Sequence, residues 1–258
     1  MVANFGRGIK QSMGVEKIQD DVVITPRREK SEKTLPANGI FLPNPGEARS
    51  AIEALKSIGS RRRFLFHSSL YVSLQEDLFV AGPAIGAPMA AMSLEKIIAL
   101  GAKRVVLVSC CGGLDPGLSV GDIVLPSRAL SGEGTAKYYQ PEAKLSPDDS
   151  LVDHLAGLLT GEGLAFHKGV IWSTDAPYRE RRGELKSLQR QHGVSGVDME
   201  FSALCAVANF RGISFAGVFV VSDLLLADQW QPGFNNKRFR HQSKTLTKLL
   251  LTNFQNPI

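Results

Sequence analysis

The chain has 258 residues, of which 43% are hydrophobic, and its formal net charge is +5. This length and composition allow a large core, fit one α/β domain better than two small ones, and exclude a fibrous or mainly disordered protein. No apolar stretch reaches the roughly 20 residues that span a bilayer, and the N-terminus is too polar for a signal peptide, so we expect a cytoplasmic protein with no membrane contact.

The cysteines and the basic residues exclude two further classes. Three cysteines, two of them adjacent, cannot form a disulfide framework and lack the paired spacing of a zinc site, so we expect reduced thiols and no metal. Lys and Arg occur in small scattered clusters without interleaved aromatic residues, so we expect solvated surfaces and no nucleic-acid partner. Only the cluster at Arg179–Arg182 lies next to a candidate site.

Charge and apolar periodicity divide the chain into an arm and a domain. Residues 1–36 are rich in charge and predict a loosely packed N-terminal arm, and residues 37–258 predict one folded domain that begins near Gly39. In chain order the predicted elements are strand 40–42, helix 47–58, strands 64–67 and 78–81, helix 88–100, strands 105–108 and 123–125, helix 149–160, strand 170–172, helix 200–210, strand 216–221 and helix 243–253. Such alternation is typical of an α/β domain.

The segment 105–113 is the first candidate for a binding site. The apolar run at 105–108 is typical of a strand covered on both faces, and the small residues at 109–113 predict a turn directly after it. Glycines at the carboxyl end of a strand let backbone N–H groups approach a ligand closely, although a tight connection alone also needs glycine. From this segment alone the two interpretations stay open.

Four junctions combine small and acidic residues at predicted strand ends: GPAIGAP at 82–88, SCCGG at 109–113, VDME at 197–200 and VVSD at 220–223. The surrounding sequence resembles the nucleoside phosphorylase and nucleosidase family, which comprises purine nucleoside phosphorylases, uridine phosphorylases and nucleosidases of the methylthioadenosine type. The blocks STDAPYRE at 173–180 and GVDMEFSALCAVANFRG at 196–212 extend the resemblance, in the family's order. It implies a single three-layer α/β domain with a central mixed, largely parallel sheet flanked by helices.

The resemblance implies roles for the acids of two junctions. Glu200 matches the carboxylate that accepts hydrogen bonds from the ribose 2′- and 3′-hydroxyls, and Met199 matches the methionine under the sugar. Asp223 matches the acid that protonates N7 of a departing purine, with Ser222 positioning it or the base. The alternatives are a first-turn acid behind an N-cap at Asp198, a core methionine, and a turn-capping aspartate.

In the same family Pro177 and Tyr178 occupy the block that encloses the base. Pro177 stands where many members have Phe, so Tyr178 is the expected stacking residue. A histidine lent by a neighbouring subunit has no clear counterpart, and His67 is a candidate that is more typical of a core or surface histidine.

The sequence departs from the family at the phosphate site. Glu47 and Leu107 stand where phosphorylases have arginines, unless Arg49 serves after a two-residue slip. Cys110 takes a hydroxyl position, so the predicted anion or water site consists of Ser109, Cys110 and Gly112. A phosphate bound without arginine partners gains too little to offset the hydration that it loses. Glu47 has two interpretations: a base that activates water, or a solvated residue in the first turn of a helix.

We therefore expect an enzyme that cleaves the N-glycosidic bond of a small-molecule nucleoside, of purine type, by phosphorolysis as in the wider family or by water. A strict nucleosidase that uses Glu47, and a nucleoside-binding protein without turnover, are the alternatives. No cofactor is expected, with phosphate left open as a co-substrate. Shared active sites in the family imply a homo-oligomer, either a dimer or a ring of dimers.

Overall fold

The computed structural model describes residues 22–75, 77–139, 145–227 and 229–254. Its elements are β1 (Asn38–Phe41), α1 (Pro45–Ser57), β2 (Ser60–Arg63), β3 (Ser69–Ser73), β4 (Leu78–Gly82), α2 (Ala87–Ala99), β5 (Arg104–Gly113), β6 (Ile123–Gly132), η1 (Ala136–Tyr138), α3 (Asp149–Gly161), β7 (Phe166–Thr174), η2 (Pro177–Arg179), α4 (Arg182–His192), β8 (Val194–Asp198), α5 (Phe201–Arg211), β9 (Ser214–Leu224), β10 (Gln231–Pro232) and α6 (Lys237–Asn253). The predicted α/β alternation is confirmed.

The described strands form one mixed sheet in the order β10-β9-β6-β7-β8-β5-β1-β4-β3-β2. β5 also pairs with β9, so the strands β5, β9, β6, β7 and β8 close on themselves while β1 to β4 extend the sheet outward. Parallel pairing joins β1 to β4 and β5, β5 to β9, and β7 to β6 and β8, and the other pairs are antiparallel. The closure brings the ends of β5, β8 and β9 to one place.

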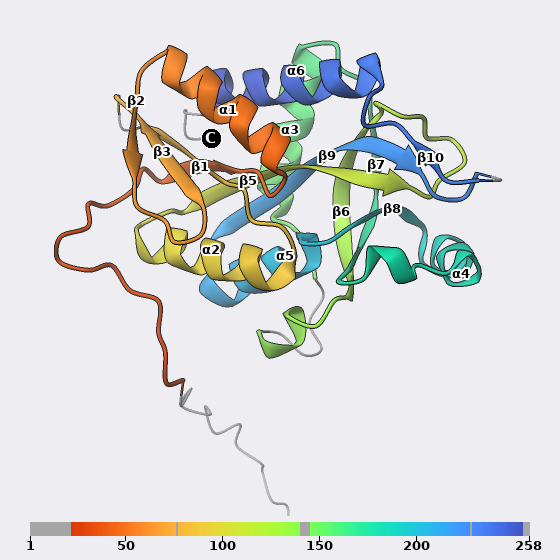
Figure 1. Ribbon diagram of the computed structural model, residues 1–258, viewed down its shortest axis with the longest axis horizontal. Helices are drawn as coiled ribbons and strands as arrows, with labels where there is room; N and C mark the ends of the chain where they lie inside the picture. The colour runs from red at the N-terminus through yellow and green to blue at the C-terminus, as the bar shows by residue number, and fades with distance from the viewer. Residues whose placement is uncertain (1–21, 76, 140–144, 228, 255–258) are drawn as a thin grey trace, which may run out of the picture.

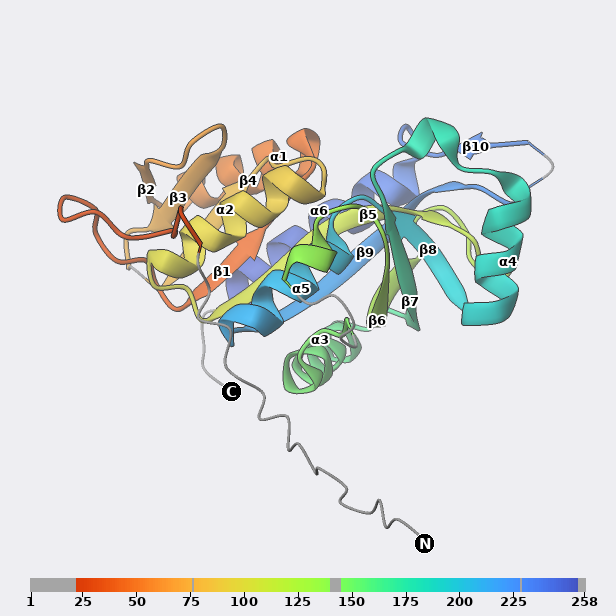
Figure 2. The same ribbon diagram turned by 90° about the horizontal axis from the view of Figure 1, so that it is seen from below.

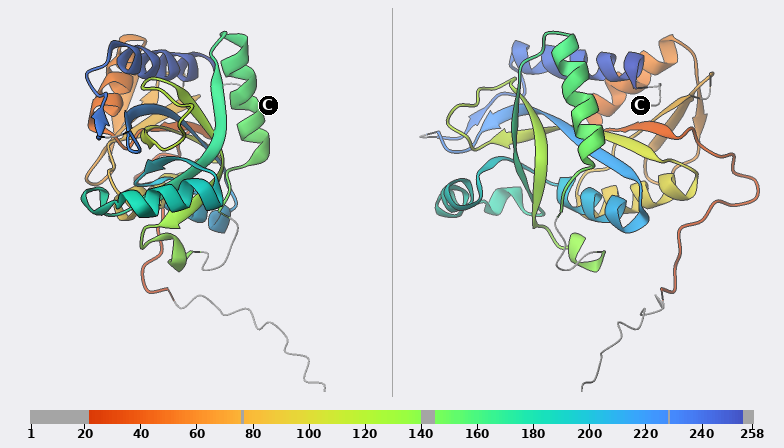
Figure 3. Two further views of the ribbon diagram at one scale, coloured as in Figure 1. Left: turned by 90° about the vertical axis from the view of Figure 1, so that its right-hand side faces the viewer. Right: turned by 180° about the vertical axis from the view of Figure 1, so that it is seen from behind.

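Helices cover both faces of the sheet. α1, α3 and α6 pack on one face against Val106 and Val108 of β5, and α2 and α5 pack on the other against Val105 and Leu107 (Figures 1 and 3). Alternate residues of β5 are thus buried on opposite faces, which is why its segment 105–108 is apolar. None of the described helices is long and apolar enough to cross a membrane.

The predicted helices are present in the structure, with different starts for α1 and α6, and one further helix, α4, was not predicted. α1 begins two residues earlier than predicted, with Pro45 in its first turn, where a missing N–H leaves no bond unmade. α6 begins six residues earlier, because the Asn236 side chain accepts a hydrogen bond from the Arg238 N–H and caps the helix. α4 was not predicted, since Leu185 is its one fully buried residue.

The predicted strand at 64–67 is wrong. These residues form a turn, with Phe64 72% exposed, and the strands lie on either side as β2 and β3. β2 has the sequence SRRR and is the edge of the sheet, where charged side chains face water. Apolar content therefore indicated the wrong four residues.

Residues 22–36 of the predicted arm run along the outside of the domain, and residues 1–21 lie outside the described residues. The segment is attached near its end, where the Leu35 N–H donates to the Leu100 carbonyl at 2.8 Å. The division at residue 36 stays a prediction.

Candidate active site

Glu200 lies where β8 ends and α5 begins, and it is only 4% exposed. The Asp198 carboxylate accepts hydrogen bonds from the N–H groups of Glu200 (3.0 Å) and Phe201 (2.7 Å), which fixes the first turn of α5. From the loop between β4 and α2, the Gly86 N–H donates to Glu200 Oε1 at 2.6 Å. The Glu200 carboxylate is therefore held by the backbone of one distant segment, the loop before α2.

Glu200 and Asp198 form a buried acidic pair. Burial raises the pKa of Glu200, and the neighbouring Asp198 raises it further. Burial also raises the pKa of Asp198, against the opposing effect of its hydrogen bonds, among them the Ser173 hydroxyl at 2.5 Å. Desolvated carboxyls of this kind are stabilised by a ligand that brings hydroxyl donors.

Asp223 lies near the end of β9 and is 7% exposed. Its Oδ1 lies 2.6 Å from the Ser222 hydroxyl, and its Oδ2 accepts a hydrogen bond from the Trp230 indole N–H at 2.7 Å. The Ser222 hydroxyl also lies 3.2 Å from the Cys111 carbonyl, to which it can donate. When the Ser222 hydroxyl donates to the Cys111 carbonyl, its oxygen is free to accept a hydrogen bond from a protonated Asp223 carboxyl. This arrangement leaves room for a proton on Asp223.

The Cys110 thiol lies among the predicted acids. Its pKa is raised to about 12, first by burial and then by the charge of Glu47, and Asp223 and Glu200 raise it as well. The Asn44 side chain, just before α1, donates to Ser109 Oγ at 3.1 Å and lies 3.5 Å from Cys110 Sγ, so the start of α1 is attached to β5. Glu47, Glu200 and Asp223 therefore all lie close enough to Cys110 for their charges to act on its thiol.

The predicted turn at 109–113 is wrong, because β5 continues to Gly113. Its residues pair with β9, with a register shift between Cys111 and Gly112, and its last two residues also pair with β8. A Cβ at Gly112 would lie 2.8 Å from Leu225 Cδ1, so a side chain there would require the Leu225 side chain to move. The glycines therefore lie in a strand and not in a turn, and the part of Gly112 in an anion or water site stays a prediction.

The sequence model of one protein family, the phosphorylase superfamily, matches residues 38–254 of this chain. The chain belongs to this superfamily. It is 27% identical over 194 residues to the uridine phosphorylase of Thermococcus kodakarensis, covering 69% of each chain.

Among solved structures, purine nucleoside phosphorylase from Toxoplasma gondii in complex with immucillin-H has a TM-score of 0.73 at 20% identity, covering 84% of this chain and 89% of that one. A futalosine hydrolase mutant of Helicobacter pylori strain 26695 has a TM-score of 0.69 at 16% identity, covering 84% and 98%. These structures share the fold. As a phosphorylase-superfamily member the chain is an enzyme that cleaves nucleoside glycosidic bonds, by phosphorolysis or hydrolysis.

The predicted sugar and base residues of this phosphorylase-superfamily chain differ in their exposure. Met199 is half-buried between the buried Asp198 and Glu200. Pro177 begins η2 and is exposed, and the Tyr178 side chain is 99% exposed. Its role in base binding stays a prediction.

The positions that bear on phosphate are also placed. Leu107 is fully buried in the core between β5 and the helices α2 and α5. Arg49 is exposed on α1, and Glu47 is half-buried in the first turn of that helix. Ser109 is buried with its hydroxyl bonded to Asn44.

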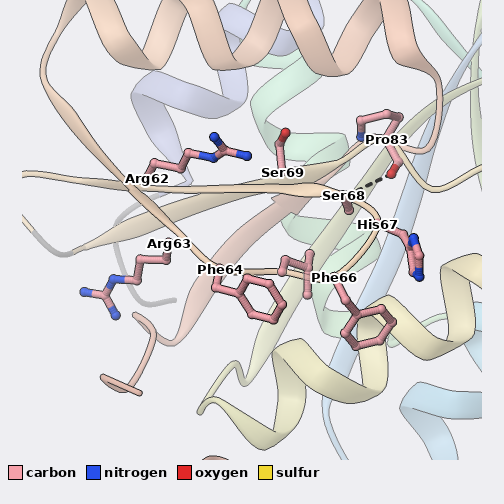
Figure 4. A pocket seen from close by; sticks show the side chains of 9 residues that line it. Arg62, Arg63, Phe64, Phe66, His67, Ser68, Ser69 and Pro83 are labelled. Atoms are coloured by element: carbon pink, nitrogen blue, oxygen red, sulfur yellow. Dashed lines mark hydrogen bonds between the residues drawn. The ribbon is translucent and has the colours of Figure 1, made fainter. Parts of the chain in front are cut away.

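A surface hollow of about 700 Å³ is lined by residues 62–69 and Pro83 (Figure 4). The Ser68 hydroxyl donates to the Pro83 carbonyl at 2.8 Å, which connects the hollow to the loop that ends at Gly86. His67 lines the hollow and not the acidic cluster, and its φ of 52° is the unusual left-handed conformation. Within the described ranges, no three His, Cys, Asp or Glu side chains are arranged to hold a metal ion.

Two site residues were missed in the sequence. Trp230 is the hydrogen-bond donor to Asp223, and Glu180 lies close enough to Asp223 for its charge to act on it. Burial, and then Asp223, raises the pKa of Glu180 to about 7. Glu180 is the last residue of the block STDAPYRE, so its sequence position pointed to the site even though its role was not predicted.

Proposed function

We propose that the chain hydrolyses the N-glycosidic bond of purine nucleosides, with Glu47 as the base that activates water. The observation that carries this proposal is the acidic cluster: the carboxyl groups of Glu47, Glu200 and Asp223 all raise the pKa of the Cys110 thiol. A phosphate dianion is repelled by such a cluster, whereas a water molecule is not. The superfamily supports cleavage of the bond, and the charge of this site favours water as the nucleophile.

Each acid has one role in the proposed reaction. Glu200 accepts hydrogen bonds from the ribose hydroxyls and stabilises the positive charge that develops on the sugar. As the bond between C1′ and N9 breaks, its electron pair moves into the base, and Asp223 donates a proton to N7. The water oxygen bonds to C1′ and its proton passes to Glu47, so the products are the neutral purine and ribose.

The decisive test follows the oxygen atom. The protein is incubated with adenosine, inosine, guanosine and uridine, with and without phosphate, in ¹⁸O-labelled water. We expect free base and ribose labelled at C1, without a requirement for phosphate. Formation of ribose 1-phosphate would overturn hydrolysis and favour the phosphorolysis that the name of the Thermococcus relative describes, and no turnover of any nucleoside would favour a binding protein.

The role of Glu47 is tested by Glu47→Gln, with Glu53→Gln as the matched control on the same helix. Glu53 is exposed and bonded to Lys56 at 3.2 Å, a surface pair of little energetic weight. We expect Glu47→Gln to lower kcat for hydrolysis by on the order of 100-fold, with the control unchanged. Equal activity of both variants would return Glu47 to a solvated position on α1.

We also propose that the enzyme is a homo-oligomer, as the resemblance implies. The hollow at residues 62–69 supports this, because Phe64, which lines it, is an exposed large apolar side chain. Sedimentation of the purified protein measures its mass, and a monomer at micromolar concentration would exclude the proposal.

A further inference from the structure

Two segments meet beside Asp223, and both are fixed to the domain. At the start of α4, Arg182 Nη1 donates to the Ala227 carbonyl at 2.6 Å, in the segment that follows β9. Leu185 of α4 shares a hydrophobic cluster with Leu225 and Leu226 of that segment. In Figure 2 α4 and β10 lie at the same end of the sheet. The residues just before α4 are therefore held next to the end of β9.

Glu180 lies two residues before Arg182 and is half-buried at this meeting point. In the part of the chain that the structure describes, its carboxylate has no hydrogen-bond or ion-pair partner. Arg179 and Arg181 beside it in the sequence are exposed, and the charge that acts on it is that of Asp223. A carboxylate that has lost part of its hydration without gaining a donor is suited to a donor from a ligand.

Purine chemistry says which donor that is. N7 and the group at C6 lie side by side on one edge of the ring: adenine presents an acceptor and an amino donor there, and guanine presents two acceptors. Asp223 faces N7 in the proposed reaction, so a second carboxylate beside it faces the group at C6. An amino group donates to that carboxylate, whereas a carbonyl oxygen is repelled by it.

We infer that Glu180 selects the base, by accepting a hydrogen bond from the amino group at C6, and that the enzyme prefers 6-aminopurine nucleosides to 6-oxopurine nucleosides. This inference rests on the proposed function. Discrimination of this kind is strong because the wrong base leaves a buried polar group unpaired.

The test compares adenosine, inosine and purine riboside, which carries hydrogen at C6, as substrates of the wild type, Glu180→Gln and Glu184→Gln at pH 8. Glu184 is an exposed acid in the first turn of α4 and is the matched control. We expect the wild type to prefer adenosine in kcat/KM. In Glu180→Gln the ratio of adenosine to inosine falls by about 10-fold to 100-fold, because the amide can donate to the inosine oxygen.

Purine riboside separates selection from a general loss of activity. Its kcat/KM is expected to be the same in Glu180→Gln and in the control. An unchanged ratio of adenosine to inosine, or an equal fall on all three substrates, would overturn the inference while leaving the proposed function in place. Failure of the wild type to cleave any purine nucleoside would overturn the proposed function and this inference with it.

Discussion

Replacing Glu200 by Gln separates the two consequences of its burial, one for activity and one for stability. The glutamine keeps a carbonyl oxygen for the Gly86 N–H, which donates to Glu200 Oε1 at 2.6 Å, so the side chain keeps its place. The glutamine lacks the negative charge, and its amide NH2 group, a hydrogen-bond donor, stands where the second carboxylate oxygen stood. The variant therefore removes charge-assisted acceptance from the ribose without creating a cavity.

The expected loss follows from two hydrogen bonds. Each bond from a ribose hydroxyl to the carboxylate contributes about 1.5 kcal/mol, so losing both costs about 3 kcal/mol, or roughly 150-fold in kcat/KM. The measurement pairs adenosine with 3′-deoxyadenosine in both proteins. The missing hydroxyl should cost the wild type about 10-fold and the Glu200→Gln variant much less.

The same substitution should stabilise the fold. The pKa of Glu200 is raised by burial and by Asp198, so the folded state favours the protonated carboxyl more than the unfolded chain does. The stability of the wild type is therefore full below about pH 4.5, the ordinary range of a glutamate, and falls as the pH rises through the raised pKa of the folded state. For each unit by which folding raises the pKa of Glu200, the free energy of unfolding at high pH falls by about 1.4 kcal/mol. A glutamine at this position does not titrate and has no such loss.

Urea unfolding at pH 5 and pH 8 measures this difference. We expect Glu200→Gln to unfold at a higher urea concentration than the wild type at pH 8, and the gap to narrow at pH 5. A variant that keeps more than a third of the wild-type kcat/KM, or that shows the same penalty for 3′-deoxyadenosine, would refute the assignment to ribose. A variant less stable than the wild type at pH 8 would refute the account of the buried charge.

Three further substitutions test other parts of the site and core. Asp223→Asn should lower kcat on adenosine by on the order of 100-fold but on a nitrophenyl riboside by no more than about threefold, because only a purine needs a proton at N7; equal losses would indicate a packing role. Cys110→Ser should form no ribose 1-phosphate in a phosphate assay, because Glu47 remains, and its appearance would contradict the charge argument. Phe201→Ala should lower the free energy of unfolding by about 3–5 kcal/mol in urea, since Phe201 is fully buried with its ring 5.4 Å from that of Phe219, and a loss below about 1 kcal/mol would mean that the core refills the space.

The sequence predicts the parts of the fold whose residues act locally. Pro88 in the first turn and Gly101 after the last turn define α2, and the structure has that helix at Ala87–Ala99. The apolar run at 105–108 predicts a strand buried on both faces, because every residue there meets a helix layer. Such signals depend on a few neighbouring residues, which a sequence displays directly.

What the sequence does not display is set by contacts between distant segments. Gly112 lies in a strand because β8 and β9 both pair with the end of β5, and the Leu225 side chain packs next to it. The small residues at 109–113 are compatible both with a turn and with a closely packed strand, so composition does not distinguish the two structures. The Trp230–Asp223 hydrogen bond, and the nearness of the Glu180 charge to Asp223, likewise depend on how the segment after β9 and the start of α4 meet, which no local pattern specifies.

The charge around Cys110 connects these distant contacts to the choice of nucleophile. Two unit charges about 5 Å apart interact by roughly 3 kcal/mol at the effective dielectric constant near a protein surface, so a phosphate dianion beside one carboxylate meets about twice that repulsion. Glu47, Glu200 and Asp223 all act at this point, and Leu107 is sealed in the core where a phosphorylase arginine is expected. A hydroxyl in place of the thiol adds one hydrogen bond of about 1 kcal/mol, which cannot offset that repulsion. In the proposed hydrolysis, the preference for water therefore follows from the carboxyl groups that the fold brings near Cys110, and not from the single residue at position 110.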